Sequence, residues 1–134
     1  MPNTIHPIDA AVARVDYFRA KLMCEMGPVE LKRLLDSKDS ILVVDVRDRD
    51  SFAKEHIPGA MSIPLHDIPK RLAELPRDKT IVCYCWSPTC FMAAKACLDL
   101  AQRDFKVLEL FGGIKAWKDA EFPAEGASIS AGHA

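Results

Sequence analysis

Apolar and polar positions follow two different periods along this chain, and the two periods predict a succession of helices and strands. Near the amino terminus, apolar residues recur every three or four positions, which predicts an amphipathic helix of about 15 residues. A short apolar edge strand is predicted over 21–26, and Gly27-Pro28 then opens a second helix. The apolar positions of the first helix are Ile8, Ala11, Val12, Val15, Phe18 and Leu22.

The strongest strand signals are two β-branched runs that are apolar on both faces. They are "SILVVDV" (40–46) and "TIVCYC" (80–85), and such runs are typical of central strands in a parallel sheet. Weaker strands are predicted over 59–64 and 105–110. Short helices are predicted between and after them, over 65–72, 91–101 and 114–120. The buried face of the helix over 91–101 is expected to carry Phe91, Ala94, Leu98 and Ala101.

This alternation predicts an α/β fold with a mainly parallel sheet and helices on both faces. Ligands of such sheets bind beyond the carboxyl ends of the strands, and Cys85 lies at such an end, just before a helix. The predicted domain covers residues 1–122, with the helix and edge strand of 1–26 preceding a core of 27–122. The small, polar segment 123–134 is expected to be disordered.

Charge and composition narrow the function classes. The formal net charge of the 134 residues is −1 and no basic face is visible, so nucleic acid is not an expected partner. No apolar run approaches the roughly 18 residues of a membrane span. Five cysteines in a chain too large to need disulfides favour reduced thiols in the cytoplasm. No plainly exposed apolar surface is predicted, which favours a monomer.

Three of the five cysteines fall within "IVCYCWSPTC", which ends at Cys90. At a junction between strand and helix, backbone N–H groups and the helix amino terminus would lower the pKa of the Cys85 thiol and make it a nucleophile. The alternative is that Cys85 is a small buried apolar residue. Cys90 is predicted either to resolve chemistry at Cys85 or simply to pack. The remaining three cysteines, Cys24, Cys83 and Cys97, are predicted to fill the core.

A zinc site is not expected here. Structural zinc sites repeat cysteine pairs two to four residues apart, often with histidines, whereas this spacing is Cys-x-Cys-x4-Cys without a nearby histidine. A Cys-x-x-Cys redox motif is also absent. We therefore expect neither a metal nor another cofactor.

Several motifs in order resemble the rhodanese-like domains. The stretch "VVDVRDRDSFAKEHIPGAMSIP" (43–64) is similar to the first motif of this family, and "IVCYC", a six-residue loop, "VLELFGGIKAW" and "FP" follow in the family's order. The resemblance covers about 41–123 and implies an open, mainly parallel, five-stranded sheet. It also implies that Cys85 carries a sulfane sulfur as a persulfide, which the anion-binding loop would hold without a metal.

The loop that would bind the anion is Trp86, Ser87, Pro88, Thr89, Cys90 and Phe91. Ser87-Pro88 also suits the start of a helix. Five further residues match the family's motifs and are predicted to support the structure rather than react. They are Asp45 and Arg47, expected to hydrogen-bond each other, the turn residue His56, and Gly112 and Gly113, which would let backbone pass close to Cys85.

This loop departs from the common pattern of its relatives, which have glycine at Pro88, arginine at Cys90 and Ser or Thr at Phe91. Pro88 removes an N–H donor, and no Lys or Arg lies between Lys79 and Lys95. A charged donor in such a site is worth on the order of 1.5–3 kcal/mol, so we expect poor use of thiosulfate. The absence of arginine six positions after Cys85 also argues against a phosphatase.

The leading prediction is a sulfurtransferase that moves sulfur from a small donor or a protein persulfide to a thiol acceptor of the thioredoxin or glutathione kind. Two alternatives stay open. One is a thiol redox protein that cycles Cys85 and Cys90 between dithiol and disulfide. The other is a non-catalytic binding module that uses Trp86 and Phe91, whose aromatic side chains flank the loop.

Overall fold

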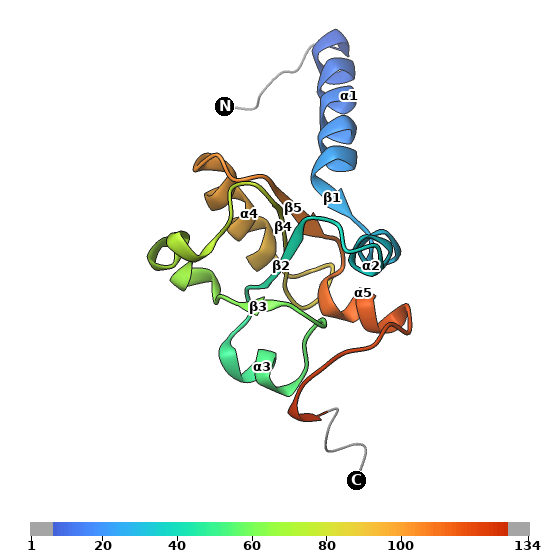
Figure 1. Cartoon of the computed structure of the whole chain (residues 1–134). Helices are drawn as coiled ribbons and strands as arrows, with labels where there is room; N and C mark the ends of the chain where they lie inside the picture. The colour runs from blue at the N-terminus through green and yellow to red at the C-terminus, as the bar shows by residue number, and fades with distance from the viewer. Residues whose placement is uncertain (1–6, 129–134) are drawn as a thin grey trace.

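The computed structural model describes residues 7–128 as one five-stranded sheet flanked by helices (Figure 1). All strand pairs are parallel, in the order β1-β5-β4-β2-β3. The predicted α/β class and its parallel sheet are confirmed. The strands are β1 (Glu25–Met26), β2 (Ile41–Asp45), β3 (Met61–Ser62), β4 (Thr80–Tyr84) and β5 (Val107–Leu110). The helices are α1 (Pro7–Cys24), α2 (Pro28–Asp36), α3 (Arg49–Lys54), α4 (Met92–Gln102) and α5 (Gly113–Asp119), with two 3₁₀ turns, η1 (Leu65–Lys70) and η2 (Leu72–Glu74).

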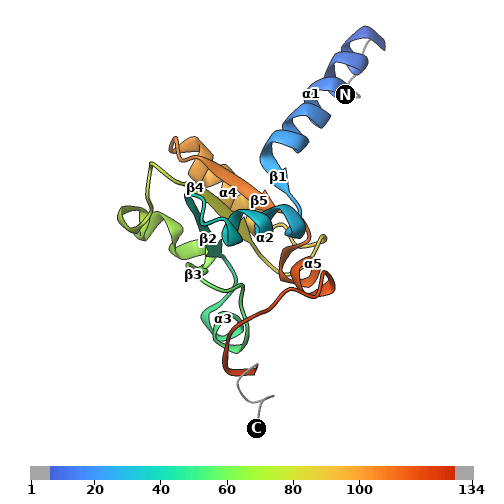
Figure 2. The same cartoon turned by 45° about the vertical axis from the view of Figure 1, so that its right-hand side comes forward.

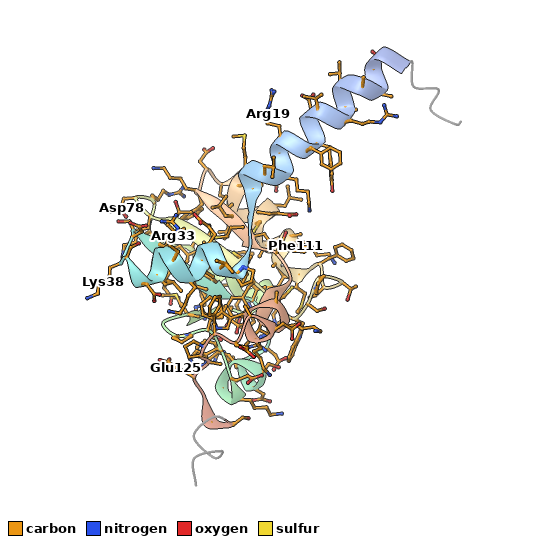
Figure 3. The ribbon with its side chains drawn as sticks, turned by 90° about the vertical axis from the view of Figure 1, so that its right-hand side faces the viewer. Arg19, Arg33, Lys38, Asp78, Phe111 and Glu125 are labelled. Atoms are coloured by element: carbon orange, nitrogen blue, oxygen red, sulfur yellow. The ribbon has the colours of Figure 1, made fainter. Side chains whose placement is uncertain are left out.

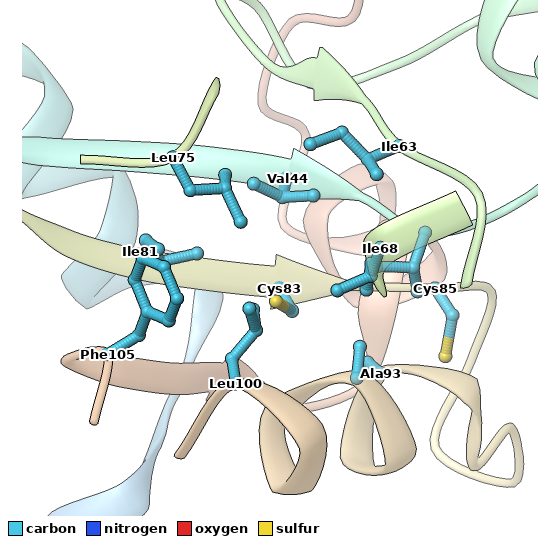
Figure 4. Packing of buried hydrophobic residues seen from close by; sticks show 12 residues of the cluster. Val44, Ile63, Ile68, Leu75, Ile81, Cys83, Cys85, Ala93, Leu100 and Phe105 are labelled. Carbon is cyan, nitrogen blue, oxygen red and sulfur yellow. The ribbon is translucent and has the colours of Figure 1, made fainter. Parts of the chain in front are cut away.

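Side chains of β4 alternate between two apolar clusters, one on each face of the sheet. Ile81, Cys83 and Cys85 enter a cluster with α4 and η1, part of which Figure 4 shows. Val82 and Tyr84 enter the opposite cluster with α2 and α5. Because both faces are covered, β4 carries the continuous apolar run that the sequence displays.

The first helix differs from its prediction. α1 extends to Cys24, leaving only two residues for β1, and it projects from the body of the protein (Figures 1 and 2). Figure 3 shows side chains along α1, Arg19 among them, reaching into open space. Val15, Phe18 and Leu22 are more than half exposed, because no element of residues 7–128 lies against them. Periodicity identified the helix correctly but not what it packs against.

The buried face of α4 also differs from its prediction. Ala93, Ala96 and Leu100 are fully buried, whereas Leu98 is 60% exposed and Phe91 is 70% exposed. The helix carries apolar residues on two stripes, so spacing alone did not decide which stripe faces the sheet. Its start differs as well. α4 begins at Met92, after the Ser87-Pro88 turn rather than within it.

Part of the carboxy-terminal segment is ordered, contrary to the expectation of disorder from residue 123. Glu125 and His56 exchange two backbone hydrogen bonds, of 2.7 and 2.9 Å. The buried Trp117 donates its indole N–H to the carbonyl of Pro123, at 2.8 Å. These contacts hold the chain as far as Glu125, and residues 129–134 lie outside the described part. Among residues 7–128, none of the helices combines the length and the hydropathy that a membrane-spanning helix needs.

Candidate active site

Cys85 directly follows Tyr84, the last residue of β4. Since β4 is the middle strand of the sheet, Cys85 lies at the carboxyl ends of the strands, near the centre of the sheet. Only 2% of the residue is exposed, and its sulfur lies at the edge of the apolar cluster beside the loop that leads to α4 (Figure 4). The start of α5 fixes the backbone here. The N–H of Ile114 donates to the Cys85 carbonyl at 3.0 Å, and the N–H of Lys115 donates to the Trp86 carbonyl at 2.9 Å. The first N–H groups of α5 therefore hold the loop and do not face the sulfur.

Gly113 makes this close approach possible. Its φ is +61°, and a Cβ atom there would lie 2.6 Å from the Cys85 carbonyl oxygen and 2.7 Å from the Trp86 carbonyl carbon. Both the left-handed backbone and the missing side chain are needed at this position. The neighbouring Gly112 is also left-handed, with φ +84°, and caps α5.

The loop folds back on itself between Ser87 and Cys90. The N–H of Cys90 donates to the Ser87 carbonyl at 3.1 Å, and the hydroxyls of Ser87 and Thr89 lie 3.2 Å apart. This turn brings the second cysteine back to the first, so that the Cys85 thiol donates to the Cys90 carbonyl at 3.5 Å. Trp86 and Phe91 flank the turn, with 44% and 70% of their surfaces exposed.

The thiols of Cys85 and Cys90 have opposite pKa shifts. Burial raises the pKa of Cys85 to about 11, with a further contribution from the Cys90 thiol, while N–H groups of Ala93 and Trp86 act in the other direction. The prediction of a lowered pKa for Cys85 is therefore wrong, because burial outweighs the backbone donors. Burial alone would raise the pKa of Cys90, but the Cys85 thiol and N–H groups of Trp86 and Met92 hold it below its usual value.

Two carboxylates that the sequence analysis did not single out lie beside the loop. Ser87, Cys90 and Phe91 line a hollow together with Glu25 and Glu109, which face each other across the β1–β5 pair. Lys21 pairs with Glu25 at 2.8 Å, whereas no ion pair to Glu109 is present within residues 7–128. Burial and the neighbouring Glu25 raise the pKa of Glu109. Only the register of two strands far apart in sequence brings these acids together.

One guanidinium lies beside the loop, and it is paired with a carboxylate. Arg47 is 1% exposed and forms a 2.7 Å ion pair with the buried Asp45, and it also donates to the Glu55 carbonyl at 2.7 Å. Its guanidinium carbon lies 4.5 Å from the centre of the Trp86 ring. Arg47 thus packs against Trp86 in the loop, and the carboxylate of Asp45 balances its charge.

The remaining predicted residues lie outside the loop. The His56 ring stacks on Phe52 at 3.8 Å, and its Nδ1 lies 2.7 Å from the Phe52 carbonyl oxygen. Cys83 is fully buried in β4, Cys97 is half-buried on α4 and donates to the Leu108 carbonyl, and Cys24 is exposed on α1. The prediction that these cysteines fill the core is therefore correct for Cys83 and wrong for Cys24. Among residues 7–128, no three His, Cys, Asp or Glu side chains gather so that they could hold a metal ion.

Comparison with known proteins agrees with this architecture. Residues 27–120 match the family described as "Rhodanese-like domain". A sulfurtransferase of Allochromatium vinosum is 41% identical over 87 residues, which is 64% of this chain and 78% of that protein. The HTH-type transcriptional regulator Rv0324 of Mycobacterium tuberculosis is 34% identical over 128 residues, and the match covers 95% of this chain but only 56% of the regulator.

A solved structure has the same fold. The BH2092 protein of Bacillus halodurans is 35% identical and superposes with a TM-score of 0.80, covering 92% of this chain and 88% of that one. The sequence match and the structural match thus point to one conclusion. This chain belongs to the rhodanese-like domain family, and its relatives include sulfurtransferases.

Proposed function

We propose that this protein is a sulfurtransferase that carries the transferred sulfur as a persulfide on Cys85. The observation that carries the proposal is the position of the Cys85 sulfur at the carboxyl edge of the sheet, where the N–H groups of Trp86 in the loop and of Ala93 in α4 favour negative charge on it. The membership of the family and the sulfurtransferase of Allochromatium vinosum support the same activity.

The reaction has two displacement steps. The Cys85 thiolate attacks the outer sulfur of a donor R–S–SH, the donor's S–S bond breaks, and R–S⁻ leaves. The outer sulfur of the Cys85 persulfide is then attacked by an acceptor thiolate, which restores the Cys85 thiolate. The N–H groups of the loop stabilise the anionic persulfide between the two steps, so that no metal is required.

The charges around the loop favour donors other than thiosulfate. Within residues 86–91 there is no cation to hold a dianion, and the hollow beside the loop contains Glu25 and Glu109. The reacting group of a low-molecular-weight persulfide or a protein persulfide carries at most one negative charge, whereas thiosulfate carries two. The acceptor would be a thiol of the thioredoxin or glutathione class.

Intact-mass measurement after incubation with glutathione persulfide or thiosulfate tests this proposal. At the earliest time points we expect one sulfur atom to add to the wild type and to Cys24→Ser, the matched control, but not to Cys85→Ser. Uptake should be faster from glutathione persulfide than from thiosulfate. Sulfur uptake that survives in Cys85→Ser would refute the role of Cys85. No uptake from either donor would favour a binding module that presents Trp86 and Phe91.

A further inference from the structure

We propose that Cys90 resolves the Cys85 persulfide, so that the protein releases the carried sulfur as hydrosulfide and is left with a Cys85–Cys90 disulfide. This inference rests on the proposed function and adds to it a product, hydrosulfide, and a required partner class, a dithiol reductant. The protein would then act as a persulfide reductase as well as a sulfur carrier.

The shape of the loop places the two thiols together. The turn that joins Cys90 to Ser87 returns the chain toward β4, and the Cys85 thiol donates to the Cys90 carbonyl at 3.5 Å. The Cys90 side chain packs against the apolar cluster that contains Cys85, and each of the two thiols shifts the pKa of the other. The backbone of Cys90 thus lies against the Cys85 sulfur, which becomes the inner sulfur of the persulfide.

The other cysteines are not placed for this role. Cys83 lies deeper in the same strand, fully buried, and its thiol interacts with that of Cys97 on α4. Cys24 is exposed on α1, outside the loop. Cys90 is the cysteine that both touches Cys85 and lines the hollow open to solvent.

The electrostatics of the pair suit a resolving thiol. In the sulfur-free protein the pKa of Cys90 lies below its usual value and that of Cys85 lies above, so Cys90 is the more acidic thiol of the pair. Glu109, which borders the same hollow, opposes this ionisation, and N–H groups of Trp86 and Met92 favour it. The loop after Cys85 contains no Lys or Arg that would form an ion pair with the persulfide. The persulfide therefore stays accessible to the Cys90 thiolate.

The step balances in atoms and electrons. The Cys90 thiolate attacks the inner sulfur of Cys85–S–SH, the bond between the two persulfide sulfurs breaks, and HS⁻ leaves with its electron pair. The products are the Cys85–Cys90 disulfide and hydrosulfide. A dithiol reductant then gives two electrons and two protons, becomes a disulfide itself, and restores both thiols.

A single-turnover experiment tests the inference. The reduced protein receives one equivalent of glutathione persulfide without any reductant, and hydrosulfide and intact mass are followed with time. We expect the wild type and Cys24→Ser to release one hydrosulfide, lose two hydrogens and yield a linked Cys85–Cys90 peptide. Cys90→Ser and Cys90→Ala should keep the added sulfur and release hydrosulfide at least about tenfold more slowly, because the internal nucleophile is gone.

Each other result decides against the inference. Hydrosulfide release that is equally fast in both Cys90 variants would overturn it, as would a stable Cys85 persulfide in the wild type. A persulfide found on Cys90 would overturn it too, since Cys90 would then have attacked the outer sulfur. If no protein takes up sulfur, the proposed function fails and the inference fails with it. Native circular dichroism of the two variants confirms that they are folded.

Discussion

Two opposing influences act on the sulfur of Cys85. Burial raises the pKa of its thiol to about 11, whereas backbone N–H groups of Trp86 and Ala93 favour the anion. In the resting protein the first influence wins and the thiol stays protonated near neutral pH. A persulfide is more acidic than a thiol and is anionic near neutral pH, so in the proposed mechanism the same N–H groups would act mainly on the persulfide of Cys85. The site is therefore better suited to holding sulfur than to attacking a poor donor.

The raised pKa predicts how the alkylation of Cys85 depends on pH. Because the thiolate is the reactive form, the rate of carbamidomethylation at Cys85 should rise about tenfold per pH unit from pH 7 to pH 10 and level off only near pH 11. A cysteine in a short unstructured peptide, with a pKa of about 8.5, should level off earlier. Peptide mass spectrometry after timed quenching measures both rates. A Cys85 rate that is flat between pH 7 and pH 9 would contradict the prediction.

Glu109 offers a second prediction at this scale. Its carboxylate borders the hollow that contains Cys90, and no cation pairs with it within residues 7–128. Glu109→Gln should raise kcat/KM for thiosulfate about three- to tenfold, since one repulsive charge near a dianion is removed. Glu74→Gln is the matched control, because η2 precedes β4 and lies at the other end of the sheet. A cyanide-coupled assay that finds equal effects for both variants would argue against this role of Glu109.

At the scale of elements, helix α4 illustrates what a sequence can and cannot predict. Its existence and approximate bounds followed from spacing, as did those of β2 and β4, because buried elements carry strong periodic or continuous apolar patterns. The buried face of α4 could not be predicted from spacing, since Leu98 and Leu100 lie on different sides of the helix and only Leu100 is buried. The position of Cys85 was predictable from the order of strand and helix. The pairing of Glu25 with Glu109 was not, because it depends on the register of β1 and β5.

The junction of β4 with α5 can be tested by adding one methyl group. Gly113→Ala should lower the free energy of unfolding by at least about 2 kcal/mol, because it combines a left-handed backbone with a clash against the Cys85 and Trp86 backbone. Gly59→Ala is the control, since Gly59 has a similar φ of +79° but no atom within 4 Å of the added Cβ. It should cost only about 1–2 kcal/mol. Urea unfolding measures both, and equal losses would mean that the close approach is not tight.

For the whole molecule, the sheet and its two clusters form a body to which α1 is only loosely attached. A groove separates α1 from α4, with Tyr17, Ala20 and Cys24 on one side and Leu98 and Ala101 on the other. Lys21 bridges part of it by lying 4.8 Å from the centre of the Phe111 ring and pairing with Glu25. The outer face of α1 remains exposed in the described part of the chain, although most of the stability of a helix in a protein comes from packing of its apolar face.

Removing α1 should therefore leave the fold intact. A chain that starts at Glu25 keeps β1 paired with β5 and loses no member of either buried cluster. We expect its free energy of unfolding to change by less than about 1 kcal/mol, as for other alterations of exposed surface, while the helical circular dichroism signal falls. Urea unfolding of both chains, with their masses in solution measured by light scattering, makes the comparison. A loss of several kcal/mol would contradict the prediction, and a full-length dimer that becomes a monomer on truncation would show that a second copy covers the exposed face of α1.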